Sequence, residues 1–298
     1  MKNRSAFLTG IAIFCCFCLL IAGGTIAGSH LNRDMLVWGI LLAEAAAFLI
    51  PTIMVILPLR RGESLKSPIA KKRISFPTVA LSVRLGITVS LASFLINLLA
   101  LQLAGQDVSI MNPALFQASD IGGHPLSYIL AVAVVPAIVE EIFLRGTVLP
   151  VFSRYAGTGL SILLTALVFA MLHGSLGNFA GPLLGGLVFG WLTFVYGSIW
   201  PAVIAHAANN LCYLFGLWLT DTYSAFGIWR QMPSFCVLLL LLFVYLSLCS
   251  VEHLLFVGRV PHFARGQRNS AALYALAGNP AAAAFIIAFF AKTVFGVI

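Results

Sequence analysis

Long apolar runs separated by short polar segments dominate the pattern of this chain. A membrane-spanning helix needs about 20 predominantly apolar residues, and most of the runs approach or exceed that length. Eight runs are clear, at residues 6–28, 35–59, 78–104, 128–150, 159–174, 182–197, 201–219 and 234–257. A ninth, 271–297, is interrupted by Gly278, Asn279 and Pro280. The pattern predicts an all-α, polytopic transmembrane helix bundle with eight to nine membrane segments.

The polar residues inside these runs are concentrated in one part of the chain. Between residues 140 and 210, the apolar segments carry two glutamates, one arginine, two histidines and two asparagines. We therefore divide the chain into N-terminal transmembrane helices and loops at 1–127, a core with the candidate chemistry at 128–219, and C-terminal transmembrane helices at 220–298.

The composition supports an integral membrane protein. Hydrophobic residues make up 61% of the 298 residues and charged residues only 9%, whereas a soluble domain has about 25% charged residues. The first apolar run is longer than the roughly 7–15 residues of a signal-peptide core, so we expect an uncleaved helix. Both a soluble enzyme and a soluble domain with a single anchor are excluded by this pattern.

The basic residues lie beside particular membrane segments, and their placement predicts the orientation. Basic side chains precede the first run and crowd the loops that follow the second and eighth runs. By the positive-inside rule these segments, and the N-terminus, are cytoplasmic, as in a protein of the cytoplasmic membrane. The loops suit contact with anionic lipid. No nucleic-acid partner is expected, because the charges are split between short loops. The residues concerned are Lys2, Arg4, Arg60, Arg61, Lys66, Lys71, Lys72, Arg73, Arg259, Arg265 and Arg268.

Two adjacent carboxylates, Glu140 and Glu141, lie in the fourth run, with Arg145 close behind. Residues four apart share a helix face, so Glu141 and Arg145 can pair, while Glu140 points elsewhere and has no local partner. A charge at this depth costs roughly 2.5–3.5 kcal/mol on insertion scales and usually marks function. An internal ion pair that only locks helices together is the simpler alternative. Pro136, one turn before Glu140, predicts a kink.

Two histidines occur in matching contexts further along the chain. His173 follows Phe169 by four residues, so the aromatic ring can brace the imidazole, and His206 shares a helix face with Asn210. Two kinds of chemistry are open to these residues. Glu140, His173 and His206 can hold a divalent metal such as zinc. Alternatively, Glu140 and one histidine polarise a water directly, while the other histidine and Asn210 donate hydrogen bonds to a developing oxyanion.

Three motifs occur in order: E-E-x-x-x-R at 140–145, F-x-x-x-H at 169–173 and H-x-x-x-N at 206–210. Together they resemble the CAAX protease and bacteriocin-processing family of intramembrane proteases, also called the type II CAAX prenyl endopeptidase or Abi family. The resemblance covers roughly residues 130–215. It implies an intramembrane endopeptidase, or metalloprotease, that cleaves a membrane-associated peptide or protein. Prenylated CAAX proteins and peptide leaders are both substrate classes of the family.

The resemblance also implies a role for each matching residue. It leaves the need for a metal open, and the chain lacks the H-E-x-x-H pair of a common type of membrane zinc protease. The implied roles are activation of the hydrolytic water by Glu140 and His173, stabilisation of the oxyanion by His206 and Asn210, and support of the site by Glu141 and Arg145.

Two other classes of protein stay open at this point. An ion-coupled transporter also uses intramembrane carboxylates and histidines as relays, although no inverted repeat is apparent in the sequence. A non-catalytic membrane scaffold or immunity protein would need only the same fold. Four further polar residues lie in apolar runs without an assigned role: Glu44, Arg84, Glu252 and His253. The six cysteines, including the Cys15 and Cys18 pair, are best explained as small apolar residues.

Overall fold

The computed structural model describes residues 2–30, 33–60, 74–103, 125–222, 232–256 and 278–295. Within these ranges every regular element is helical and none is a strand, which confirms the predicted fold class. The two basic clusters in the loops near 61–73 and 257–270 lie outside the described residues. The same holds for residues 271–277 of the ninth run.

Nine helical segments account for the described chain, and the fourth of them is divided into short pieces. The continuous helices are α1 (Lys2–His30), α2 (Arg33–Arg60), α3 (Phe76–Leu103), α8 (Thr158–Leu172), α9 (Ala180–Tyr196), α10 (Trp200–Thr222), α11 (Met232–Phe256) and α13 (Pro280–Phe295). The divided segment consists of α5 (Pro125–Tyr128), the π-helical turn η2 (Ile129–Val134), α6 (Val135–Phe143), a second π-helical turn η3 (Leu144–Val148) and α7 (Leu149–Phe152).

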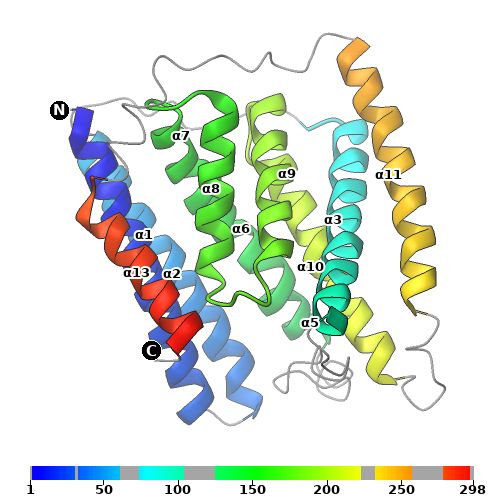
Figure 1. Cartoon of the computed structure of the whole chain (residues 1–298), viewed down its shortest axis with the longest axis horizontal. Helices are drawn as coiled ribbons and strands as arrows, with labels where there is room; N and C mark the ends of the chain where they lie inside the picture. The colour runs from blue at the N-terminus through cyan, green and yellow to red at the C-terminus, as the bar shows by residue number, and fades with distance from the viewer. Residues whose placement is uncertain are drawn as a thin grey trace.

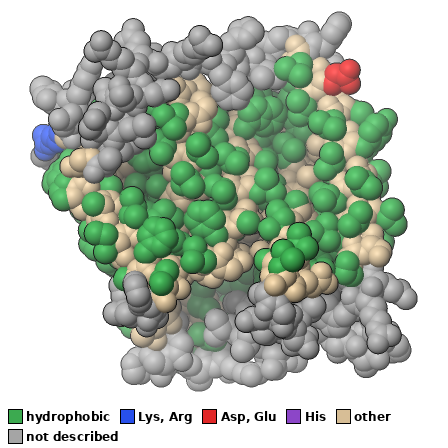
Figure 2. All heavy atoms as spheres, viewed as in Figure 1, with side chains coloured by type: hydrophobic (Ala, Val, Ile, Leu, Met, Phe, Trp, Pro, Cys, Tyr) green, Lys and Arg blue, Asp and Glu red, His purple; other side chains and the backbone are tan. Residues whose placement is uncertain are grey.

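Six of these segments are long and apolar enough to cross a membrane, and three shorter apolar helices accompany them. The short ones are α8, α9 and α13, and the first two agree with the short runs at 159–174 and 182–197. Hydrophobic side chains cover the middle of the face shown in Figure 2, and α11 exposes Leu238, Leu241, Leu248 and Tyr245 on its outer side. Such a surface is stable in lipid rather than in water, so the chain is an integral membrane protein.

The helices are arranged around a centre formed by α6, α8, α9 and α10 (Figure 1). On one flank, α1 packs against α2 and α13; on the other, α3 packs against α9, α10 and α11. The buried core includes Phe143, Phe169, Phe189 and Leu192 from the central helices. Those side chains of the central helices that face this core are therefore shielded from lipid.

Small residues let α8 and α9 approach closely, as the glycines of the sixth run suggest. A Cβ atom on Gly186 would lie 2.7 Å from the Cα and Cβ atoms of Ala166, and one on Gly190 would lie 2.9 Å from Cγ2 of Ile162. Real Cβ atoms essentially never come within about 3 Å of such neighbours, so any larger residue would push the helices apart. In lipid, close packing of this kind replaces the hydrophobic effect as the force that joins helices.

The hydrogen-bond ladder of the fourth segment changes at Pro136, where a kink is expected. The wide turn η2 directly precedes α6, and Pro136 is the second residue of α6. A second wide turn, η3, begins one residue before Arg145. π-Helical turns inside α-helices occur frequently at functional sites. Here they bracket the short helix that carries both glutamates.

The last helix begins at the interruption seen in the sequence. Asn279 caps α13, because its Oδ1 accepts a hydrogen bond from the backbone N–H of Ala281 at 3.0 Å. Pro280 then occupies the first helical position, which needs no N–H donor. The amide nitrogen of Asn279 donates to the backbone oxygen of Ala6 in α1 at 3.0 Å. This contact fixes the start of α13 against the first helix.

The glycine at position 186 gives the first testable prediction. Gly186→Ala places a methyl group against the backbone of Ala166, so we expect the free energy of unfolding to fall by about 1–3 kcal/mol. Gly24→Ala is the matched control, since a Cβ there meets nothing within 4 Å. Thermal unfolding in detergent micelles measures both. Equal stability of the two variants would contradict the close α8–α9 packing.

Candidate functional site

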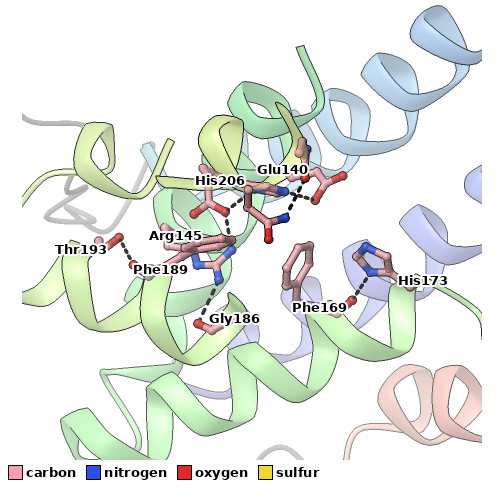
Figure 3. Close-up of polar contacts among 11 residues, drawn as sticks. Glu140, Arg145, Phe169, His173, Gly186, Phe189, Thr193 and His206 are labelled. Atoms are coloured by element: carbon pink, nitrogen blue, oxygen red, sulfur yellow. Dashed lines mark hydrogen bonds and ion pairs between the residues drawn. The ribbon is translucent and has the colours of Figure 1, made fainter. Parts of the chain in front are cut away.

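A chain of buried charged groups joins α6 to α10. Nη1 of Arg145 donates to Oε1 of Glu141 at 2.7 Å, and both side chains are fully buried. The same carboxylate oxygen lies 3.0 Å from Nδ1 of His206. The pairing of Glu141 with Arg145 is the one that their spacing predicts. The contact with His206 adds the seventh membrane segment to this network (Figure 3).

Arg145 has further partners that compensate its burial. Nη2 donates to the backbone oxygen of Gly186 in α9 at 3.0 Å. The guanidinium also lies 5.2 Å from the ring centre of Phe169 and 5.6 Å from that of Phe189, within the range of cation–π attraction. A buried arginine is tolerated only when its charge and its N–H groups are paired in this way. Arg145 therefore connects α6, α8 and α9 at one point.

Glu140 points to a different side of α6 from Glu141, as expected for neighbours on a helix. Only 6% of the residue is exposed. Its Oε2 atom lies 3.8 Å from Nε2 of His206, which is ion-pair range but too long for a hydrogen bond. Oε2 makes no hydrogen bond to any described residue. A buried carboxylate oxygen next to an imidazole is thus left open to another molecule.

His206 is held between the two glutamates. A carboxylate can only accept, so Nδ1 of His206 carries the proton directed at Glu141 and Nε2 faces Glu140. The ring stacks on Phe189, with centroids 4.9 Å apart and planes 20° apart. Its orientation is therefore fixed by a hydrogen bond on one edge and an aromatic ring on one face.

His173 lies at the end of α8, and its side chain is exposed to a greater extent than that of His206. Nδ1 lies 2.9 Å from the backbone oxygen of Phe169. Because that oxygen only accepts, Nδ1 carries the proton and Nε2 keeps its lone pair. The Phe169 ring stands edge-to-face to His173 at 4.8 Å and to His206 at 5.6 Å. The predicted bracing by Phe169 is present, and the same ring serves both imidazoles.

Asn210 lies one turn after His206 on α10 and is half-buried. Its Oδ1 accepts a hydrogen bond from Nδ2 of Asn209 at 3.0 Å. With the oxygen occupied, the amide nitrogen of Asn210 is the group left to donate. Asn209 therefore orients a residue for which the sequence predicts a donor role.

Glu44 of α2 contributes a third carboxyl group, which interacts with that of Glu140. One turn further along each helix, Phe48 and Phe143 pack with ring centres 5.9 Å apart, so these faces of α2 and α6 are in contact. The sequence places Glu44 at membrane depth but gives no sign of its partner. Glu44, Asn209, Phe189 and the carbonyl of Gly186 are the parts of the site that the motifs do not include.

The other polar residues of the apolar runs lie elsewhere. Arg84 donates to the backbone oxygen of Leu246 at 3.3 Å and to Oγ of Ser250 at 2.7 Å, and so joins α3 to α11. Glu252 is exposed near the end of α11. The side chain of His253 lies outside the described residues.

The residues predicted to hold zinc do not form a ready ligand set. Among the described residues, no group of three or more His, Cys, Asp or Glu side chains is arranged to hold a metal ion. Each histidine directs Nδ1 at a protein acceptor, His206 at Glu141 and His173 at the Phe169 backbone, which leaves each Nε2 available as a ligand. A catalytic zinc site needs three protein ligands around one point. The steps proposed below are written for the side chains alone, and the need for a metal is tested by experiment.

Fold and site together define a polytopic membrane protein with a buried carboxylate–imidazole centre. Residues 122–212 match a family model described as Rce1-like, type II CAAX prenyl endopeptidase Rce1-like. This segment contains all three motifs, and the match confirms the resemblance that they predict. No curated protein and no solved structure matches the chain.

The buried ion pair gives the second prediction. Arg145→Met leaves Glu141 without its cation, and the loss of one partner from a buried pair typically costs about 3–5 kcal/mol in unfolding free energy. In Glu141→Met/Arg145→Met neither charge remains unpaired, so we expect the double variant to be more stable than Arg145→Met. Arg4→Met, at an exposed arginine, controls for the loss of a positive charge. Thermal unfolding of the unaltered protein, Glu141→Met, Arg145→Met, the double variant and Arg4→Met tests this, and additive losses of the two single variants would contradict the pairing.

Proposed function

We propose that the protein is an intramembrane endopeptidase that hydrolyses a peptide bond in a membrane-associated substrate. The observation that carries the proposal is the approach of Glu140 Oε2 to His206 Nε2, 3.8 Å apart inside a lipid-embedded bundle. The match of residues 122–212 to a CAAX-type endopeptidase family supports the same reaction. In the proposed reaction the carboxylate is a base for the attacking water and the imidazole is a hydrogen-bond donor to the developing oxyanion, so no covalent intermediate is needed.

In the proposed reaction Glu140 and His173 activate the water. Oε2 of Glu140 is free of hydrogen bonds to the described residues, and Nε2 of His173 keeps a lone pair because Nδ1 donates to Phe169. One of these bases takes a proton as the water oxygen attacks the scissile carbonyl carbon. The proton then passes to the departing amine nitrogen as the C–N bond breaks, which gives a carboxylic acid and an amine. The acid then loses its remaining proton to the amine or to solvent.

His206 and Asn210 are placed to stabilise the negative charge that develops on the carbonyl oxygen. The amide of Asn210 donates because Asn209 occupies its oxygen. His206 donates from Nε2 when its ring is protonated, and that nitrogen faces the side of Glu140. A single oxyanion donor is typically worth about 2.7–4 kcal/mol of barrier. Glu141 and Arg145 are positioning residues that hold His206.

The substrate classes of the proposal are a prenylated CAAX-type protein and a peptide leader, both carried at the membrane. The proposed orientation places the N-terminus in the cytoplasm. In Figure 1 the start of α1, the end of α2, the start of α3 and the end of α11 lie at the same side of the bundle. These helix ends lead into the basic segments of the sequence, so one side of the bundle receives the positive charge that the positive-inside rule assigns to the cytoplasm.

Removal of the proposed bases gives the third prediction. We expect Glu140→Gln and His173→Ala to lower kcat/KM by about 10²–10⁴, the usual contribution of a general base. Glu252→Gln is the matched control, because it removes an exposed carboxylate at a helix end. The measurement is cleavage of a farnesylated peptide in proteoliposomes by variants shown to be folded. Full activity of folded Glu140→Gln would overturn the proposal, and inactivity of the unaltered protein on every peptide would favour a scaffold.

The fourth prediction concerns the metal. The proposed steps use only side chains of the protein, so on this proposal we expect cleavage to survive prolonged treatment with a strong zinc chelator followed by gel filtration. Elemental analysis of the treated protein checks that metal has been removed. Loss of activity that returns on addition of zinc, but not of buffer, would show that Glu140, His173 and His206 rearrange around a metal.

A further inference from the structure

One face of α13 is turned toward the site rather than toward lipid. Phe285, Phe289 and Lys292 are spaced four and three residues apart, so they share this face. Phe285 packs on Phe17 of α1, with ring centres 5.3 Å apart. Phe289 packs on Phe179, with ring centres 6.2 Å apart. Both phenylalanines of α13 are almost fully buried, so Lys292 is on the inward side.

Lys292 lies along the glycine that follows His173. A Cβ atom on Gly174 would be 3.3 Å from Nζ, 3.4 Å from Cε and 3.6 Å from Cδ of Lys292. Gly174 has a φ of 63°, the left-handed conformation that lets the chain turn directly after His173. Lys292 itself is half-buried. Its ammonium group is therefore beside the turn that carries one of the proposed bases.

The anions among the described residues do not pair with this cation. Among the described residues, no carboxylate lies within ion-pair distance of Lys292, and Glu140 and Glu141 face His206 and Arg145 instead. A lysine in the last turn of a membrane helix often extends toward the lipid surface and complements the helix dipole. Lys292 does the opposite, since its alkyl chain runs inward along Gly174. A charge held this way is costly in a membrane unless a ligand pairs with it.

We propose that Lys292 binds the free C-terminal carboxylate of the peptide substrate. The inference rests on the proposed endopeptidase function. A peptide lying in the site offers an anion at its C-terminus, and a lysine ammonium recognises a carboxylate as a compact point charge with three donors. Lipid phosphate has similar chemistry but would approach from the outer side of α13. Lys292 is then a specificity-determining residue of the site.

The position of Lys292 also limits where the scissile bond lies. An extended peptide advances about 3.3–3.6 Å per residue, and Lys292 lies against the neighbour of His173. A substrate anchored at Lys292 is therefore cut within a few residues of its C-terminus. This favours a substrate processed at its end over a long leader cut in its interior.

The fifth prediction uses two farnesylated peptides of identical sequence, one ending in a carboxylate and one in an amide. We expect the unaltered enzyme to prefer the acid by about tenfold in kcat/KM, as for one charge-assisted hydrogen bond. Lys292→Gln should lose that preference through a higher KM for the acid, with the amide unchanged. Lys292→Arg should keep most of it. Arg4→Gln removes an exposed cation elsewhere and should behave as the unaltered enzyme.

Three results would overturn the role of Lys292. Equal rates for acid and amide in the unaltered enzyme would leave the endopeptidase function standing without carboxylate recognition. Equal losses on both peptides in Lys292→Gln would show that the residue acts through lipid or stability. The third result comes from calorimetry in micelles, which measures how the acid and amide peptides bind to Glu140→Gln and to the double variant Glu140→Gln/Lys292→Gln. Equal affinity of these two variants for the acid peptide contradicts the inference even if no peptide is cleaved.

Discussion

The neutralisation of charge inside the membrane is the constraint on which this structure depends. Glu141 is acceptable at full burial only because Arg145 and His206 both contact its carboxylate. Arg145 in turn needs the Gly186 carbonyl and two aromatic rings. An isolated charge in lipid costs several kcal/mol, and removal of one partner leaves the other uncompensated. These contacts hold α6, α8, α9 and α10 in one arrangement, so the same interactions that make the fold possible also set the geometry of the site.

Packing of small and aromatic residues gives that arrangement its precision. Gly186 and Gly190 bring α9 against α8, and this approach allows a backbone carbonyl to reach the buried guanidinium. Phe169 and Phe189 fill the remaining space and orient the imidazoles through edge and face contacts. Aromatic rings can do this in lipid, where hydrophobic burial gives little preference between side chains.

The two histidines of the site have different surroundings, and this difference supports different tasks. His206 is buried between two carboxylates, an environment that stabilises a donor. His173 is exposed at a helix end with its Nδ1 fixed on the backbone, which leaves an acceptor. Lys292 approaches the same turn from the last helix. A substrate that reaches His173 thus meets a base and a cation together, while the buried groups remain sheltered from lipid.

The sequence alone determined the features that depend on local periodicity. The lengths of the apolar runs predicted the helices, although the bounds of α9 and α13 differ from those of the runs. The spacing of four residues predicted the Glu141–Arg145 and Phe169–His173 contacts. Sequence spacing also showed that Glu140 has no partner on its own helix. Only the tertiary structure decided that the neighbours of Glu140 are His206 and Glu44. It also decided that the Gly186 carbonyl accepts a hydrogen bond from Arg145 and that Lys292 lies beside Gly174. Those contacts join residues that lie 41 to 118 positions apart in the sequence, and no local pattern encodes which faces of two distant helices will meet.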